Sequence, residues 1–116
     1  MKKRKTNISF FFGEGVRTHS GPAIYKISFS TGENYIGKAI LLKNRITSHV
    51  TDCFCFFVKS PSLRKMVKYE GAISFEVIEY IEPGNPSFLR ERELYHIKNH
   101  PHPDKRLNFC NRPAAV

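Results

Sequence analysis

The stretch AIYKISFSTGENYIGKAILLKNRITSH, residues 23–49, decides the fold because it changes from strand-like to helix-like periodicity. Residues 23–29 are rich in β-branched and aromatic side chains, STGEN is typical of a turn, and a second short run covers residues 34–38. We therefore predict a β-hairpin. An odd number of loop residues would place Tyr25 and Tyr35 on the same face of the hairpin, and an even number would place them on opposite faces.

A first helix is predicted over residues 40–49. Its apolar residues recur at helical spacing: Leu41, Leu42 and Ile46. At about 100° per residue, Arg45 lies about 40° and His49 about 80° round from Leu41. Both polar side chains are therefore expected inside the apolar stripe.

The rest of the chain carries further helix and strand patterns. SPSLRKMVKYEG, residues 60–71, has a serine cap, an early proline and a terminal glycine, which predict a second helix. AISFEVIEYI, residues 72–81, alternates like a strand. NPSFLRERELYHIKNHP, residues 85–101, predicts a third helix with Asn85 as its cap and Pro86 opening it. ISFFF, residues 8–12, can add an edge strand.

These elements follow in the order β-β-α-α-β-α, which predicts an α/β domain with a small mixed, mainly antiparallel three-stranded sheet flanked by helices. A chain of 116 residues with 41% apolar residues is long enough for one modest core. We place this domain at residues 21–116 and treat residues 1–20 as a basic N-terminal extension.

The charge and cysteine content narrow the range of partners and compartments. A formal charge of +9 predicts a polyanionic partner, and nucleic acid is favoured over a membrane because no run of about 18 apolar residues occurs. The N-terminal apolar run is shorter than a secretory core of about 7–15 residues, so we expect a cytoplasmic protein. The three cysteines, Cys53, Cys55 and Cys110, are expected to be reduced packing residues, because C-x-C lacks a partner pair for zinc.

Glu93 is the carboxylate that does not fit a surface role. It lies about 40° from both Leu89 and Ile97 on the third helix, which places it on the core-facing stripe. A carboxylate there must be paired or bound to a metal. One alternative is an ion pair with Arg45. The other is a cleft where Arg45 meets a phosphate and Glu93 holds Mg²⁺, which suits one carboxylate plus waters and phosphate oxygens.

Together these residues form a recognisable set. It comprises AIY at residues 23–25, YIG at residues 35–37, Arg45 eight residues after Gly37, His49 one turn later, Glu93 in RERELYHI and Asn108 in RLNFCN. Over residues 21–108 the chain resembles the GIY-YIG nuclease superfamily. It departs from that pattern at Ala23, where the first motif usually has glycine.

The resemblance implies a domain that hydrolyses DNA phosphodiesters with Mg²⁺ or Mn²⁺ at a site on one face of the sheet. Glu93 would be the metal ligand, Tyr25 the general base, and Tyr35 would orient the attacking water. Because the ordinary tyrosine pKa is near ~10, Tyr25 would need nearby positive charge to become a phenolate. Arg45 would clamp the phosphate. His49 would donate to the phosphate or the leaving group, or assist a tyrosine.

The remaining implied roles concern support and binding. Asn108 would fix the site by hydrogen bonding, and Lys38 and Lys43 would join Arg45 in contacting DNA. We expect a standalone phage or mobile-element (homing) endonuclease on double-stranded DNA, a monomer or weak homodimer that takes specificity from a separate subunit or domain. The alternatives are a structure-specific repair or recombination nuclease subunit and a non-catalytic basic nucleic-acid-binding protein.

Overall fold

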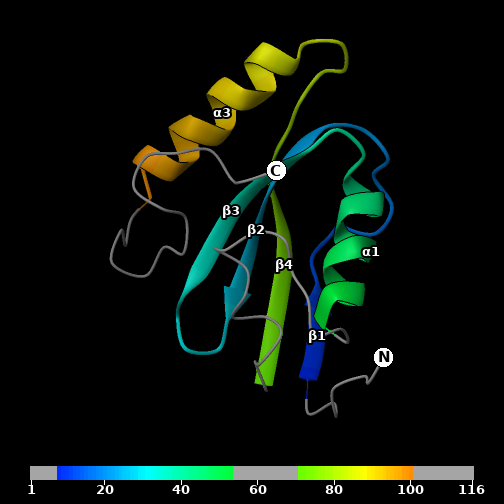
Figure 1. Cartoon of the computed structure of the whole chain (residues 1–116), viewed down its shortest axis with the longest axis vertical. Helices are drawn as coiled ribbons and strands as arrows, with labels where there is room; N and C mark the ends of the chain where they lie inside the picture. Colours follow the sequence, from blue (N-terminus) through cyan, green and yellow to red (C-terminus); the bar gives the residue numbers. More distant parts are fainter. Residues whose placement is uncertain (1–7, 54–70, 101–116) are drawn as a thin grey trace.

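The computed structural model describes residues 8–53 and 71–100. Within these ranges the chain forms four strands and two helices (Figure 1). They are β1 (Ile8–Phe12), β2 (Ala23–Phe29), β3 (Asn34–Ala39), α1 (Leu42–Cys53), β4 (Gly71–Tyr80) and α3 (Pro86–Lys98). The helix predicted at residues 60–71 lies outside the described residues except for Gly71, which instead begins β4.

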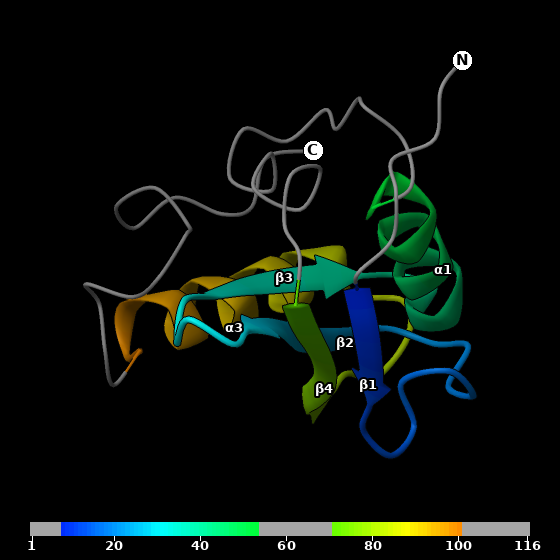
Figure 2. The ribbon, with the colours of Figure 1, turned by 90° about the horizontal axis from the view of Figure 1, so that it is seen from below.

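The four strands form one mixed sheet in the order β1-β4-β2-β3. β2 pairs antiparallel with β3 and β4, while β1 pairs parallel with β4. The predicted α/β class is confirmed. The prediction of a three-stranded sheet is wrong, because residues 8–12 form a fourth strand that pairs with β4. As Figure 2 shows, β3 leads directly into α1.

The hairpin register places the two tyrosines on the same face of the sheet. Ile27 lies opposite Tyr35 and Tyr25 lies opposite Gly37. The loop closes with the Phe29 N–H donating to the Glu33 carbonyl at 2.9 Å, which leaves three residues between them. This odd number keeps the side chains of both tyrosines on one side, because directly opposed residues of an antiparallel pair project to the same face.

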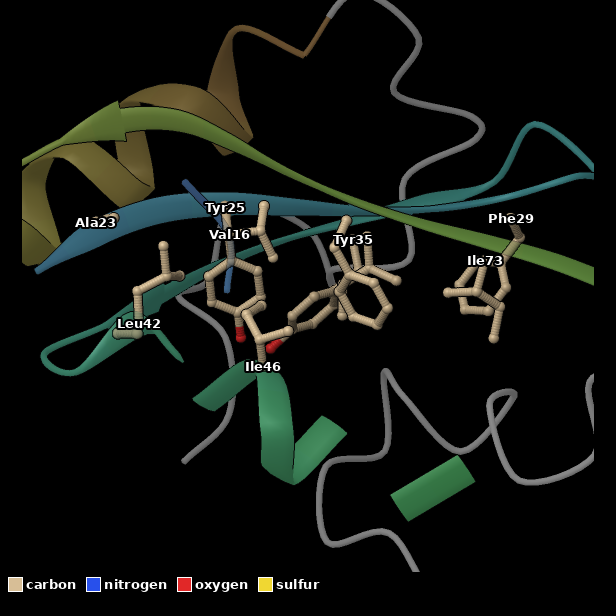
Figure 3. Close-up of a cluster of buried hydrophobic side chains, with 11 residues drawn as sticks. Val16, Ala23, Tyr25, Phe29, Tyr35, Leu42, Ile46 and Ile73 are labelled. Carbon is tan, nitrogen blue, oxygen red and sulfur yellow. The ribbon is translucent and has the colours of Figure 1, made fainter. Parts of the chain in front are cut away.

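The two helices cover opposite faces of the sheet (Figure 3). The larger cluster packs under α1: Val16, Ala23, Tyr25, Ile27, Phe29, Tyr35, Ala39, Leu42, Ile46, Ile73 and Phe75. The smaller cluster packs under α3: Ile24, Ile36, Ile81, Leu89 and Ile97. β3 is an edge strand in contact with both helices. Side chains from both covered faces of the sheet therefore lie near this edge.

The buried stripe of α1 is rotated from the one we predicted. Leu42, Ile46 and His49 are buried, whereas Leu41 and Arg45 are exposed. The three buried positions fall within about 60° of one another at helical spacing. We had counted Leu41 as part of the apolar stripe, which rotated the predicted stripe toward Arg45. The predicted burial of His49 is therefore correct, and the predicted position of Arg45 inside the stripe is wrong.

α3 begins and faces the sheet as the sequence predicts. The side chain of Asn85 accepts a hydrogen bond from the Phe88 N–H at 3.0 Å, and Pro86 is the first helical residue. Leu89, Glu93 and Ile97 are its buried residues. Pro101, the last residue of the predicted helical stretch, lies outside the described residues.

Candidate active site

A buried hydrogen bond joins β2 to α1. The Tyr25 hydroxyl lies 2.7 Å from Nε2 of His49, and both side chains are buried. Figure 3 shows Tyr25 and Tyr35 pointing from the sheet toward α1, with their hydroxyl ends turned toward one another. Three residues of the predicted set, Tyr25, Tyr35 and His49, therefore meet beneath α1.

Gly37 provides the space for the Tyr25 ring. A Cβ atom at position 37 would lie 2.5 Å from both Cζ and the hydroxyl oxygen of Tyr25. The ring can therefore cross β3 only because its partner in the register has no side chain. On the other side of β2, the register with β4 shifts between Ile24 and Tyr25. A bulge of this kind re-aims the neighbouring side chains.

Burial keeps Tyr25 and His49 uncharged at neutral pH. Burial, together with the positive charge of Arg45, lowers the pKa of His49 from 6.5 to about 4. Burial also raises the pKa of Tyr25 well above 10.0; Tyr35 and Glu93 add to this rise, and Arg45 opposes it. The shift is opposite to the one that a Tyr25 phenolate needs, because desolvation outweighs the nearby arginine.

A second polar pair, with only its carboxylate fully buried, lies under α3. The Nζ atom of Lys38 is 3.5 Å from Oε1 of Glu93, whose side chain is fully buried. The sequence had suggested Arg45 as the partner of Glu93. The structure pairs Glu93 with Lys38, which can reach it because side chains alternate along β3, so that Gly37 faces α1 and Lys38 faces α3.

A groove opens where the end of β3 meets the starts of α1 and α3. It has a volume of about 530 Å³. The described residues that line it are Lys38, Ala39, Ile40, Leu41, Asn44, Arg45, Ser48, Pro86 and Leu89. Two of the residues predicted to bind DNA, Lys38 and Arg45, thus share one open surface. The exposed Lys43 is near in sequence but does not line the groove.

Backbone hydrogen bonds at the start of α1 position the part of the helix that lines the groove. The carbonyl oxygens of Gly21 and His19 accept hydrogen bonds from the N–H groups of Leu42 and Lys43, each at 3.1 Å. These bonds satisfy donors that have no partner within the helix. They hold the first turn of α1 against the loop before β2 and so fix the direction in which Arg45 projects.

The residues of the candidate site therefore lie on both sides of the β3 edge. Tyr25 and His49 lie on the α1 side, and Glu93 lies on the α3 side. The two sides remain within electrostatic range, because both Arg45 and Glu93 act on the pKa of Tyr25. Asn108 lies outside the described residues.

Sequence reasoning missed the apolar part of the groove. Ile40 and Leu41 are exposed, although Leu41 was assigned to the core stripe. The signal was available in the run Ile40-Leu41-Leu42, because three consecutive residues of the predicted helix would span about 200° and could not all face one sheet.

The donor chemistry of Glu93 fits a hard divalent cation. Mg²⁺ is commonly held by one or two carboxylates, with waters and phosphate oxygens completing its shell. Lys38 now supplies the compensating positive charge, so a cation would have to take over that role. Residues 8–53 and 71–100 contain no group of three or more His, Cys, Asp or Glu side chains arranged to hold a metal.

Comparison of the chain with protein-family models, with curated proteins and with solved structures found no match. In the described part of the chain, neither helix has the length and apolar character needed to cross a membrane.

Proposed function

We propose that this chain is a divalent-metal-dependent DNA endonuclease with a GIY-YIG-type nuclease domain. The observation that carries the proposal is the buried Tyr25–His49 hydrogen bond within electrostatic range of Arg45, which lines a groove together with Lys38. Glu93, some 55 residues from Lys38 in the chain, is paired with it at the same strand edge. A phosphate-binding surface with a buried acid–base pair and a carboxylate behind it suits phosphodiester hydrolysis.

In the proposed reaction the proton of the attacking water moves through Tyr25 to His49. The water oxygen bonds to phosphorus as its proton passes to the Tyr25 hydroxyl, which gives its own proton to Nε2 of His49. The bond from phosphorus to the leaving oxygen breaks, and that oxygen takes a proton from solvent. This relay needs a neutral imidazole but no preformed phenolate, in agreement with the lowered pKa of His49 and the raised pKa of Tyr25.

Binding of the phosphate would also strengthen the proton acceptor. The positive charge of Arg45 contributes to the low pKa of His49. When a phosphate oxygen pairs with Arg45, that charge is neutralised and the pKa of His49 rises toward its ordinary value. Arg45 thus serves both as the phosphate clamp and as a link between substrate binding and basicity.

Lys38 and Glu93 complete the proposed site. Transfer of the Lys38 ammonium from Glu93 to a phosphate would leave the carboxylate ready to bind Mg²⁺ or Mn²⁺. When bound, such a metal ion stabilises negative charge on the scissile phosphate and the leaving oxygen. Because Tyr25, His49 and Glu93 are buried, cleavage also requires the groove wall to open and expose them to the substrate.

That same burial favours a second candidate, a basic protein that binds nucleic acid without cutting it. Tyr25 with His49 and Lys38 with Glu93 form pairs that a purely structural core would also tolerate. Under this alternative the groove cations still bind phosphate, but no variant changes a cleavage rate. Both candidates predict double-stranded DNA as a partner and a cytoplasmic location. Only a test for DNA cleavage can therefore distinguish them.

The test is relaxation of supercoiled plasmid by the full chain with and without Mg²⁺. We expect nicking with Mg²⁺ and none with EDTA. Tyr25→Phe should lower the rate on the order of 10²-fold or more, the usual contribution of a positioned acid–base group. Tyr95→Phe, which removes an exposed hydroxyl on α3, is the matched control and should cut normally. Plasmid left intact by the native chain in Mg²⁺ and in Mn²⁺ would favour the binding protein.

A further inference from the structure

Two large aliphatic side chains stand exposed between β3 and α1. Ile40 is 65% exposed and Leu41 is 52% exposed, whereas Leu42 next to them is fully buried. They follow directly after β3 and lie beside Lys38 and Arg45 in the same groove. The folded core does not use these two side chains.

The groove combines an apolar surface with positive charge. Its apolar lining comes from β3, the β3–α1 turn and the start of α3: Ala39, Ile40, Leu41, Pro86 and Leu89. Asn44 and Ser48 add polar groups from α1, and none of the described lining residues is acidic. A smaller neighbouring cavity of about 190 Å³ shares Ile40, Pro86 and Leu89, so the apolar surface continues beyond the groove.

This combination matches the parts of a single nucleotide. Aliphatic side chains can cover a base or sugar, cations bind the attached phosphate, and amide or hydroxyl groups can reach the base edge. The volume of about 530 Å³ lies within the range of roughly 300–1,000 Å³ typical of small-ligand sites. A stacked base inside a duplex cannot enter such a groove, because it must first leave the stack, and leaving the stack costs free energy.

We propose that the groove is a subsite for one unstacked nucleotide next to the phosphate held by Arg45 and Lys38. The proposal rests on the proposed nuclease function and adds a substrate class to it: DNA with an unpaired or easily unstacked nucleotide at the cut. Ile40 and Leu41 cover the displaced base, in the way that apolar wedges of other DNA-binding proteins stabilise unstacked steps. DNA that already carries an unpaired base avoids the unstacking cost and binds more tightly.

The test measures binding without cleavage. The full chain is titrated in EDTA against two short duplexes that contain 2-aminopurine, one paired with thymine and the other as a single unpaired bulge. We expect the bulged duplex to bind more tightly by on the order of tenfold, the effect of an unstacking cost above 1 kcal/mol. Its fluorescence should rise on binding, because an aliphatic pocket separates the base from its stacked neighbours.

Variants of exposed residues test whether the preference for the bulged duplex depends on the groove. Ile40→Ser and Leu41→Ser should each reduce the preference for the bulge several-fold without changing the melting temperature, because both side chains are exposed. Phe11→Ser, an equivalent change at a 57% exposed position on β1, is the control and should keep the preference.

The outcomes separate the subsite from the nuclease. If the chain nicks plasmid but binds both duplexes equally, the subsite is wrong and the nuclease proposal stands. If it fails to nick but keeps a bulge preference that Leu41→Ser removes, the nuclease proposal fails and the groove remains a base-binding site. Equal binding of both duplexes together with Leu41-dependent binding to anionic lipid vesicles would overturn the subsite in favour of a membrane contact.

Discussion

At the scale of single residues, His49 shows how burial sets chemistry. A histidine at the surface would be partly protonated near pH 6.5, but at this position burial and the Arg45 charge hold the imidazole neutral to about pH 4. The neutral ring can accept the proton of Tyr25 throughout the physiological range. Burial therefore removes the need for a phenolate, which the same burial makes costly at Tyr25.

The lowered pKa of His49 predicts a loss of stability in mild acid. The unfolded chain takes up a proton near pH 6.5 and the folded chain only near pH 4, so unfolding is favoured as pH falls through this window. A shift from 6.5 to about 4 corresponds to about 3 kcal/mol. Urea unfolding measured between pH 4 and pH 7.5 should show the free energy of unfolding of the native chain falling as the pH falls. The same plot for His49→Asn should have a much smaller slope. Equal slopes in both proteins would contradict the assignment.

At the scale of elements, a cluster of Glu79 with Arg92 and His96 holds α3 to β4. Glu79 on β4 accepts hydrogen bonds from Arg92 Nε at 2.8 and 3.1 Å, and lies 2.8 Å from Nε2 of His96. Partial burial raises the pKa of Glu79, but the hydrogen bonds from His96 and Arg92 outweigh it and hold the pKa below its ordinary value. α3 carries Glu93, so this cluster supports the position of the carboxylate.

The Glu79 cluster predicts that α3 detaches in acid. A carboxylate with a depressed pKa contributes stability above its ordinary value near 4.5, and that contribution is lost as pH falls through the folded pKa. Glu79→Gln should therefore speed amide hydrogen exchange in α3 at pH 7, and the difference from the native chain should shrink below pH 4. Glu76→Gln breaks a more exposed pair with Lys26 and serves as the control, with little change expected.

The sequence predicted local features of the elements better than their contacts. The Asn85 cap and the burial of Glu93 followed from short-range rules of cap and period, whereas the shared face of Tyr25 and Tyr35 depended on a loop length that the sequence left open. The parallel pairing of β1 with β4 did not, because strand pairing over sixty residues leaves no local signal. The pairing of Glu93 with Lys38 was also missed, because Arg45 was the cation considered and the contact joins residues 55 positions apart in the chain.

At the scale of the whole molecule, the charge of +9 predicts binding that depends strongly on salt. Each phosphate contact by a lysine or arginine contributes about 0.9 to the slope of log affinity against log salt concentration on duplex DNA. Arg45→Gln should reduce this slope by about 1, measured by fluorescence anisotropy from 50 to 200 mM salt. Lys98→Gln, an exposed charge on α3 away from the groove, should reduce it less. Equal losses would indicate a diffuse field instead of a groove contact.

The overall architecture explains why the site spans a strand edge. β3 is an edge strand that contacts both α1 and α3, and its alternating residues direct Gly37 to one helix and Lys38 to the other. Under the proposed function, Tyr25 and Glu93, which begin on opposite faces, would act on one phosphate at this edge. The proposed reaction requires both residues, because the relay would move the proton and the carboxylate would hold the metal.

The rate of Mg²⁺-dependent nicking by Glu93→Gln tests this requirement most directly. The amide keeps the size of the side chain but removes the charge, and Glu91→Gln, an exposed position on the same helix, is the control. We predict that Glu91→Gln cuts at the native rate, and that Glu93→Gln, at a melting temperature showing it is folded, cuts on the order of 10²-fold more slowly or not at all. A folded Glu93→Gln protein that nicks plasmid as fast as Glu91→Gln would contradict the proposed site.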